Sequence, residues 1–522
     1  MAEQTAQLKL NYKKTILTGF GFMASCVAWA VYDPYITKLL DHLLGASPTV
    51  AAWSEKLASV SFLQRFMESQ GNSAVSAAGR FTIVPLLIGF IMTFDNIFGV
   101  IFQPTFGKLS DRCHSRFGKR RPFILFGAPV SALLFALIPL MGTIPATMVC
   151  VILFVFVMSL WRAPVVALMP DLTPPELRSQ GNAVINLMGG IGTALATVLG
   201  TIVTAFYLKA NGMTKDSPGY DEFKTFPYVF LSVGAIMVLG MVVVMLFVKE
   251  KDSRLLSGDI IASRDEVARR AAEKKAEAEQ KAELKAQKLG KAERRSLLFM
   301  LGGLFFLYCG SNAIQTFFAL FASEILHRDT AEAQRLMLVF AVATAAAAIP
   351  AGWLGKKLGR KKTILLGLGI FLAAFVVFFA VFAAVGARKG FSLGDYVALN
   401  RDDPNNPTVS ATAGMLNALV FPVLILAGFG NMLITVNTLP LVLEIGGLKK
   451  VGTFTGYYYT ATFSAQIASP IVYGFFRMFS GTYLSLFYYS PIAFALAAAV
   501  IVFVRHGEAI PEKVLKEIEE KE

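Results

Sequence analysis

Long apolar runs recur along the whole chain, and they constrain its fold more than any other feature. A helix that crosses a bilayer needs about 20 apolar residues, and lipid leaves no water to bond exposed backbone groups. The 522-residue sequence is 55% hydrophobic and only 16% charged. It therefore predicts an all-α membrane protein with twelve transmembrane helices in two pseudo-symmetric six-helix bundles. The helices are expected near 14–38, 81–107, 122–141, 146–168, 182–208, 226–248, 296–322, 335–355, 362–386, 412–440, 453–478 and 482–504.

The first apolar run is expected to stay in the mature protein. It follows Lys13 and Lys14, and it continues past Cys26 to Tyr35 without a small-residue cleavage site. The four cysteines are widely scattered and have no metal-ligand spacing. The sequence thus predicts a retained helix and no metal site.

Basic residues cluster in alternate loops between the apolar runs. The formal net charge of +14 gathers in 108–121, 249–295, 356–362 and 449–450. Such clusters mark cytoplasmic loops in membrane proteins, so they do not indicate nucleic-acid binding. We expect a multi-pass protein of the cell membrane, an inner membrane where there are two, with both termini in the cytoplasm.

Three polar segments divide the chain. We expect an N-terminal six-helix bundle at 1–248, a polar helical linker at 249–295 and a C-terminal six-helix bundle at 296–522. The external loop 39–80 contains helical apolar spacing over Val50 to Glu68, which predicts an interfacial lid helix. A second external loop, 387–411, is rich in turn residues and is expected to be mobile.

The two halves repeat one loop motif. The sequence Gly107-Lys-Leu-Ser-Asp-Arg112, followed by Phe117-Gly-Lys-Arg-Arg121, returns as Gly352-Trp-Leu-Gly-Lys-Lys357, followed by Leu358-Gly-Arg-Lys-Lys362. Pro170-Asp171 is likewise echoed by Pro440 and Glu444. Internal repeats of half-domains are typical of alternating-access carriers, whose sites lie near mid-membrane.

These two loops resemble the signature of the major facilitator superfamily. A narrower resemblance joins the stretch from Gln103 to Ile124, with its four-residue insertion, and Trp29–Tyr35 to the sugar:cation symporters of the glycoside-pentoside-hexuronide type. That group is related to plant sucrose carriers and to the melibiose carrier. The resemblance implies a twelve-helix carrier that moves a sugar with a coupling ion.

The chain departs from the melibiose carrier where that protein holds sodium. Gly99 and Gln103 occupy the positions of its paired carboxylates, and a lone Asp95 lies about one turn away. This difference favours a proton as the coupling ion.

Charged residues inside the membrane are costly, by about 3 to more than 10 kcal/mol, unless they are paired, neutralised or hydrated. Asp95 and Arg162 fall at compatible depths on the second and fourth helices. We assign Asp95 to ion coupling, with Asp33 as the second candidate, and Arg162 to substrate binding. Two structural readings stay open: a static Asp95–Arg162 salt bridge, and a helix-ending role for the Asp33-Pro34 pair.

Uncharged polar and aromatic side chains supply the other candidates for substrate binding. Hydrogen-bonding groups read sugar hydroxyls, while aromatic faces cover the pyranose plane. Each polar residue alone is also a candidate for bonding between helices. The candidates are Trp29, Tyr32, Asn96, Asn312, Gln315, Asn431 and Gln466.

The first loop motif also predicts a cytoplasmic gate. Acidic and basic groups at helix ends form charge-assisted hydrogen bonds that would hold the inner face shut. Lys356 replaces the aspartate of the motif in the second copy, so we expect the full latch in the first half only. The gate residues are Gly107, Asp111, Arg112, Arg116, Gly118, Lys119, Arg120, Arg121, Asp171 and Arg178.

The sequence contains no nucleophile triad, nucleotide-binding loop or metal cluster, so it predicts neither an enzyme nor a cofactor. The leading hypothesis is proton-coupled symport of a sugar or glycoside, such as a sucrose- or maltose-like disaccharide. The expected partners are the sugar, the proton and the lipid bilayer, with the chain acting as a monomer. An exporter of drugs or metabolites and a non-transporting membrane receptor remain the alternatives.

Overall fold

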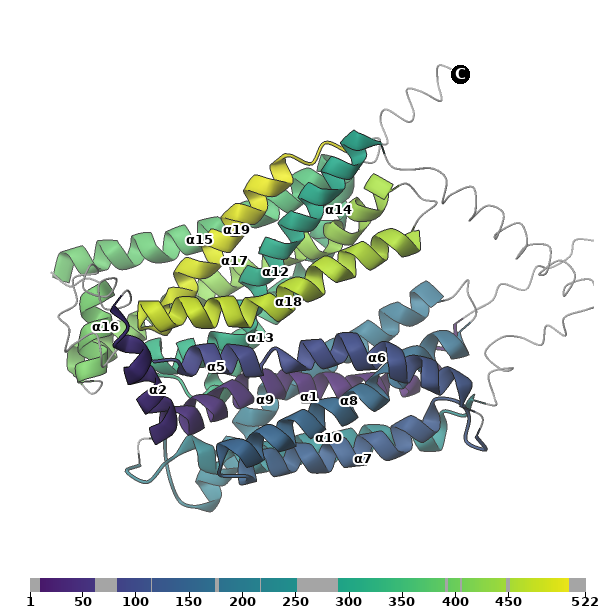
Figure 1. Cartoon of the computed structure of the whole chain (residues 1–522), viewed down its shortest axis with the longest axis horizontal. Coiled ribbons are helices and arrows are strands. Elements are labelled where there is room, and N and C mark those ends of the chain that lie inside the picture. Colours follow the sequence, from purple (N-terminus) through teal and green to yellow (C-terminus); the bar gives the residue numbers. More distant parts are fainter. Residues whose placement is uncertain are drawn as a thin grey trace, which may run out of the picture. The chain divides into compact units, whose positions relative to one another are not determined.

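The computed structural model describes residues 10–61, 82–113, 115–173, 178–215, 217–250, 290–389, 393–403, 406–446 and 451–506. All regular structure within these residues is helical (Figure 1). The chain forms two compact units, which are described separately. Unit 1 comprises Met1–Ser47 and Phe94–Val267, and unit 2 comprises Pro48–Thr93 and Ala268–Glu522.

Unit 1 consists of long apolar helices with short connections. Proline in the first turn begins three of them, α7, α8 and α10, because a missing N–H costs nothing at that position. Asn11 caps α1 by accepting a hydrogen bond from the Lys14 N–H at 3.1 Å. The helices are α1 (Tyr12–Gly45), α6 (Phe94–Arg112), α7 (Arg121–Leu137), α8 (Ile144–Leu172), α9 (Arg178–Ala210) and α10 (Phe226–Phe247), with short 3-10 turns at Ile138–Leu140 and Glu222–Lys224.

Aromatic rings and small residues fill the interior of unit 1. The Phe135 ring stacks on Phe230 at 4.4 Å between centroids, and Phe226 contacts Tyr35 edge-on at 4.8 Å. Glycine allows α10 to approach α1: a Cβ on Gly240 would lie 2.7 Å from the Ala24 Cβ. This packing fixes α1, which carries Asp33, beside α10, and α1 also packs against α8, which carries Arg162.

Unit 2 contains the helices of the second half and two segments that precede α6 in the sequence. Asp329 caps α13 in a capping box with Glu332, whose N–H it binds at 2.8 Å. In Figure 1, α12, α17, α18 and α19 run alongside one another. The helices are α2 (Pro48–Ala58), α5 (Val84–Ile91), α12 (Lys291–Ile325), α13 (Thr330–Ala346), α14 (Ala348–Leu358), α15 (Arg360–Lys389), α16 (Leu393–Asp402), α17 (Pro407–Gly446), α18 (Val451–Ser480) and α19 (Leu486–Val502), with a 3-10 turn at Tyr483–Ser485.

The span expected at 81–107 is interrupted, and its two parts belong to different units. The helix breaks between Ile91 and Phe94, giving α5 and α6. Helix α5 packs backbone to backbone on α18, because a Cβ on Gly89 would lie 2.0 Å from the Pro470 carbonyl oxygen. The Thr93 hydroxyl also donates to the Ile467 carbonyl at 3.1 Å. The break therefore lies directly before Asp95, in the first turn of α6.

The membrane-spanning character of the chain is confirmed. Among the described residues, ten helices are long and apolar enough to cross a bilayer, or eleven if the bent pair Thr330–Ala346 and Pro350–Leu358 counts as one span. The predicted span 453–478 lies within α18, a 30-residue helix that is not among the ten. The number twelve stays a prediction.

Two expected segments are only partly described. The lid helix expected over Val50–Glu68 appears as α2, which ends at Ala58, and residues 62–68 lie outside the described part. The Ser54 hydroxyl on α2 accepts a hydrogen bond from the Ile83 N–H at 3.2 Å, which ties α2 to the start of α5. Most of the expected linker, 251–289, also lies outside the described residues.

The loop expected to be turn-rich and mobile at 387–411 contains a docked helix, α16. The Tyr396 side chain is buried, and its hydroxyl donates to the Ile325 carbonyl at 2.7 Å. Asn400 donates to the Glu324 carbonyl at 2.6 Å. Turn residues at 403–407 hid this helix from the sequence pattern, and its contacts with the end of α12 are long-range.

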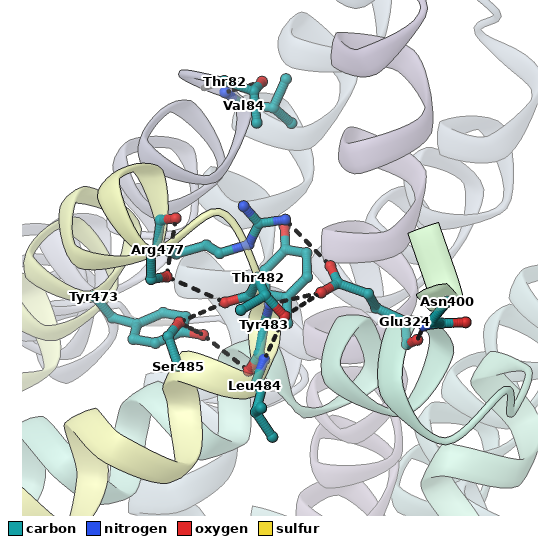
Figure 2. A network of polar contacts seen from close by, with 11 residues as sticks. Thr82, Val84, Glu324, Asn400, Tyr473, Arg477, Thr482, Tyr483, Leu484 and Ser485 are labelled. Atoms are coloured by element: carbon teal, nitrogen blue, oxygen red, sulfur yellow. Dashed lines mark hydrogen bonds and ion pairs between the residues drawn. The ribbon is translucent and has the colours of Figure 1, made fainter. Parts of the chain in front are cut away.

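That end of unit 2 carries a polar clamp centred on Glu324, shown in Figure 2. The Glu324 carboxylate pairs with Arg477 at 3.1 Å and accepts from the Thr482 hydroxyl at 2.5 Å and the Tyr483 N–H at 2.9 Å. The Arg477 guanidinium also lies over the Tyr483 ring, 4.3 Å from its centroid. The clamp joins the ends of α12 and α18 to the turn that leads into α19.

Candidate functional site

Three charged side chains from three helices meet inside unit 1. Asp33 lies on α1, Asp95 in the first turn of α6 and Arg162 on α8. Arg162 interacts electrostatically with both carboxyl groups, and Asp33 interacts with Asp95. All three side chains are largely shielded from solvent. The three charges therefore gather in one partly buried region of unit 1. The static Asp95–Arg162 salt bridge that the sequence left open is not among the ion pairs of the described residues.

The break before α6 positions Asp95. A helix N-terminus carries a partial positive charge and free N–H groups, which favour a carboxylate in the first turn. The Asp95 Oδ1 accepts from the Asn96 N–H at 2.6 Å and from the Asn96 side-chain amide at 2.8 Å. Asn96 was predicted to bind substrate, and here its amide is bonded to Asp95.

Asp33 belongs to this cluster and does not end its helix. The Asp33-Pro34 pair was expected near the end of the first helix, but α1 continues through Pro34 to Gly45. A proline inside a helix removes one backbone bond and is tolerated where neighbouring helices pack around it. The helix-ending reading of Asp33 is therefore wrong.

Aromatic rings cover the charged cluster on one side. The Arg162 guanidinium carbon lies 5.4 Å from the centre of the Trp29 ring, a cation–π distance. Trp29 contacts Tyr32 edge-on at 5.3 Å, and Tyr32 stacks on Phe154 at 5.7 Å. The predicted residues Trp29 and Tyr32 thus lie beside Arg162.

Two polar atoms of this aromatic group have no hydrogen-bond partner among the described residues. They are the Trp29 indole nitrogen and the Tyr32 hydroxyl, and both are buried. An unpaired buried donor costs about 1–3 kcal/mol, so a ligand that pairs with it gains that amount. The site can therefore hydrogen-bond a ligand that carries hydroxyl oxygens.

Sequence reasoning missed two residues of this site, Phe154, which contacts Trp29 and Tyr32, and Cys26. Phe154 lies two helical turns before Arg162 on α8, and the Cys26 thiol of α1 interacts electrostatically with Arg162. The spacing of eight residues between Phe154 and Arg162 was a usable signal, since it places both on one helix face. Nothing in the sequence pointed to Cys26.

The predicted binding residues of unit 2 fall into two groups. Asn312 on α12 donates to the Gln466 carbonyl on α18 at 3.3 Å, so these two form a contact between helices. Ser469 reinforces it by donating to the Cys309 carbonyl at 2.6 Å. Gln315 and Asn431 instead line a pocket of about 570 Å³, counting the space at its mouth, between α12, α13, α15, α17 and α19.

Arg120 is the centre of the first loop motif. Its side chain is only 7% exposed and pairs with Asp171 at 2.8 Å and with Asp111. It also donates to the Ser110 hydroxyl and to the Gly107 carbonyl, the latter at 3.2 Å. Burial alone would lower the pKa of Arg120, but the hydrogen bonds and charges of the two aspartates outweigh it and raise that pKa. The loop thus has one buried cation held by two acids.

Glu250, which the sequence did not single out, anchors the same loop. Its carboxylate accepts from three consecutive backbone N–H groups, those of Lys119, Arg120 at 2.7 Å and Arg121 at 2.8 Å. These groups form the N-terminus of α7, where an anion is stabilised. Gly118 has φ +112°, and a Cβ there would lie 2.4 Å from the Glu250 Oε2. The glycine is therefore needed for this close approach.

The other predicted gate residues are peripheral. Arg116 is exposed and lies over the Phe117 ring at 4.8 Å, and the side chains of Arg112 and Lys119 are exposed. The Arg121 guanidinium donates to the Met245 carbonyl near the end of α10. Arg178 begins α9, and its side chain lies outside the described part.

A sequence profile of the MFS/sugar transport protein family matches residues 80–443. The human membrane-associated transporter protein is 34% identical over 122 residues, 20% of this chain and 23% of that protein. A sucrose transport protein of Arabidopsis thaliana is 32% identical over 129 residues, 20% and 22% of the two chains. The mouse proton-associated sugar transporter A is 35% identical over 122 residues, 20% and 16%. The matches thus span about a fifth of these curated relatives.

Solved structures share the fold at low sequence identity. A bacterial homologue of the human lysosomal transporter Spinster aligns over 95% of each chain with a TM-score of 0.52 and 12% identity. The nucleoside transporter NupG aligns over 94% of this chain and all of its own, with a TM-score of 0.55 and 12% identity. At this identity the likeness concerns the fold alone.

Proposed function

The chain belongs to the MFS/sugar transport protein family, a non-enzymatic class of membrane transporters, and from that premise we propose that it is a proton-coupled symporter of a sugar or glycoside. The proposal includes twelve membrane spans in two six-helix bundles, 1–248 and 296–522. Both termini would lie in the cytoplasm, and the protein would act as a monomer. Substrate and proton would move together by alternating access.

The observation that carries the proposal is the partly buried cluster of Asp33, Asp95 and Arg162. Two carboxyl groups near one cation hold a net charge that a proton neutralises. Such neutralisation favours the conformational change of the loaded carrier, because a neutral site in a low-dielectric interior costs less free energy than a charged one. The names of two relatives, the sucrose transport protein of Arabidopsis thaliana and the mouse proton-associated sugar transporter A, support the same substrate and ion.

Substrate binding would use the groups that surround this cluster. The unpaired Trp29 indole nitrogen and Tyr32 hydroxyl would bond sugar oxygens, and the Arg162 guanidinium would bind two neighbouring hydroxyls with its forked donors. The Trp29 face would cover a pyranose ring. Protonation of Asp95 would then leave Asp33 as the one charged carboxyl group near Arg162, which couples the proton to the geometry of the binding groups.

The decisive experiment compares exchange with accumulation in the Asp95→Asn variant. An amide mimics the protonated, loaded carrier, so counterflow of labelled sugar should continue in proteoliposomes. Accumulation driven by a proton gradient should disappear, because the empty carrier cannot release a proton and return. Asp33→Asn, measured in parallel, is the matched variant that shows which carboxyl group carries the proton.

Each outcome has a definite meaning. Proton-driven accumulation by Asp95→Asn would remove Asp95 from ion coupling, and loss of exchange as well would assign it to sugar binding or folding. Exchange of only another class of solute by the wild type would support an exporter of drugs or metabolites. Absence of all exchange would support a membrane receptor.

Orientation is tested separately by labelling single cysteines in a background without native cysteines. A cysteine placed in 249–295 should react with an impermeant thiol reagent only from the cytoplasmic side, and one in 395–405 only from outside. Reaction of both from the same side would contradict the proposed topology.

A further inference from the structure

The break between α5 and α6 contains a buried threonine, Thr93, whose side chain replaces a bond of the backbone. Its hydroxyl donates to the Gly89 carbonyl, four residues before it, at 2.9 Å. In an unbroken α-helix the Thr93 N–H would bond that carbonyl, but here it bonds the Phe90 carbonyl at 3.3 Å. A hydroxyl that bonds the carbonyl four residues back often bends its helix. Thr93 therefore contributes to the end of α5.

The same hydroxyl ties the break to α18. Thr93 also donates to the Ile467 carbonyl at 3.1 Å, so carbonyl groups of two helices share one hydroxyl proton. Close backbone packing holds α5 on α18 as well. A Cβ on Gly474 of α18 would lie 2.4 Å from the Pro85 carbonyl oxygen of α5, which mirrors the contact of Gly89 with α18. Helix α5 is therefore fixed on α18 up to the break.

On the other side of the break, Asp95 uses the N-terminus of α6. The Asn96 N–H bonds the Asp95 Oδ1 at 2.6 Å, whereas in an unbroken helix it would bond the Met92 carbonyl. A carboxylate accepts such a bond more strongly than a carboxylic acid does, and its charge interacts favourably with a helix N-terminus. The interruption of the helix thus suits the ionised form of Asp95.

Three other titratable side chains act on Asp95. Arg162 of α8 and Asp33 and Tyr32 of α1 interact with it electrostatically. These neighbours influence whether Asp95 is charged. The bond at the break is made by Asp95 itself, so a change in its charge acts on the helix directly.

We propose that Thr93 is a positioning residue for Asp95: it keeps the helix interrupted while Asp95 is ionised, and protonation of Asp95 allows the helix to become continuous. In the continuous form the Asn96 N–H would bond the Met92 carbonyl, and the span would lose a break that is costly in lipid. Because α5 is fixed on α18, closing the break would change the direction of α6. This inference rests on the proposed function, which assigns the proton to Asp95.

The first test measures the break in the wild-type protein. Amide hydrogen exchange of 90–97 would be followed by mass spectrometry at acidic and alkaline pH, with rates corrected for the intrinsic pH dependence of exchange. Protection should rise about fivefold or more on acidification, because backbone N–H groups gain helical partners. Asp95→Asn carries no charge and should be protected at both pH values. Asp33→Asn is the matched variant and should keep the pH-dependent change.

The second test removes the Thr93 hydroxyl. Thr93→Val keeps the shape of the side chain, loses both bonds and should give a continuous helix at every pH. Ionised Asp95 then loses its helix N-terminus, so it binds a proton more readily, and the pH of half-maximal proton-driven uptake should shift upward by about one unit. Thr93→Ser restores the hydroxyl and should behave like the wild type.

Thr105 on α6 provides the matched control for the threonine hydroxyl. It is exposed, and its hydroxyl donates to the Ile101 carbonyl, also four residues before it, at 2.8 Å. Thr105→Val should therefore change neither the exchange of 90–97 nor the pH of half-maximal uptake.

The outcomes separate this inference from the proposed function. Protection of 90–97 that does not depend on pH, or that stays pH-dependent in Asp95→Asn, would overturn it and leave sugar transport standing. A Thr93→Val variant that lowers uptake by one factor at every pH would also overturn it, since a purely structural role does not shift the pH profile. If Thr93→Val does not fold, the exchange measurements decide alone. Proton-driven accumulation by Asp95→Asn would contradict the proposed function, and this inference would fail with it.

Discussion

The two copies of the loop motif differ in how many acids hold them. In unit 1, Arg120 binds Asp111 and Asp171, and Glu250 binds the backbone beside it. In unit 2, Arg360 pairs with Glu444 alone among the described residues, at 2.8 Å. The basic residue that follows each arginine has the same role, since Arg121 binds the end of α10 and Lys361 binds the Val502 and Val504 carbonyls at the end of α19.

This difference has a counterpart in the interiors of the two units. Unit 1 holds charges beside unpaired polar groups, whereas the pocket of unit 2 is lined by uncharged residues and its strongest described clamp, Glu324–Arg477, lies at the end opposite the loop motif. The two copies of the loop motif thus keep a similar fold, while the charged residues around them differ. We interpret unit 1 as the part that carries both the charges that respond to the proton and the sugar-binding groups proposed around Arg162, and unit 2 as the part that contributes uncharged groups.

The largest expected effect comes from Arg162→Ala. Its removal leaves two partly buried carboxyl groups without the nearby cation, so sugar exchange should fall at least about hundredfold even without an ion gradient. Gln315→Ala in unit 2 removes one uncharged group and should cost about tenfold or less. Counterflow in proteoliposomes measures both. Comparable losses in the two variants would contradict the proposed difference between the units. Normal exchange by Arg162→Ala would show that Arg162 has only a structural role.

A smaller effect is expected at the loops. Arg120→Gln removes two ion pairs and two further hydrogen bonds, and Arg360→Gln removes one described ion pair. Because Asp111 and Asp171 are about half exposed, solvent weakens each pair, and we expect accumulation rates to fall about tenfold and about threefold, respectively. Initial rates of uptake in vesicles, corrected for protein amount, distinguish the two. Equal losses would show that both copies act as equivalent latches.

The role of Glu250 is tested by two glycines of the first loop. Gly118→Ala forces a Cβ against the Glu250 carboxylate at a φ of +112° and should lower the free energy of unfolding by about 1–3 kcal/mol. Gly107→Ala meets nothing within 4 Å and should cost little. Thermal unfolding of the purified protein in detergent measures both. The anchor would be unsupported if the two variants unfolded at the same temperature, or if Glu250→Gln left stability unchanged.

The smallest effect is expected at the clamp of unit 2. Glu324→Gln removes the charge that faces Arg477 but keeps an oxygen acceptor, so unfolding should become easier by about 1 kcal/mol. Sugar exchange should not change, because none of the clamp residues lines the pocket. Glu55→Gln on the exposed face of α2 is the control and should alter neither property. A loss of exchange in Glu324→Gln would place the clamp in the transport cycle.

Much of the fold was predictable because hydropathy is a local property. Helix positions, the membrane class and the repeated loop could be read from the sequence, and so could Arg162 and Asp95, since a charge within an apolar run stands out. Trp29 and Tyr32 followed from the resemblance of Trp29–Tyr35 to the sugar:cation symporters and from the tendency of aromatic faces to cover a pyranose ring. Asn312 and Gln466, which were predicted to bind substrate, join α12 to α18 in the structure through the Gln466 backbone carbonyl.

Other features depend on which distant segments pack together. The sequence by itself determined a chain of membrane helices with a duplicated loop, because each apolar run must satisfy its own backbone bonds in lipid. Only the tertiary structure decided that α5 joins unit 2, that Asp33 lies beside Arg162, that Glu250 caps α7 and that phenylalanines from several helices enclose one pocket. Those features depend on glycine contacts and side-chain packing between residues far apart in the chain. The periodicity of apolar residues along the sequence does not specify such contacts.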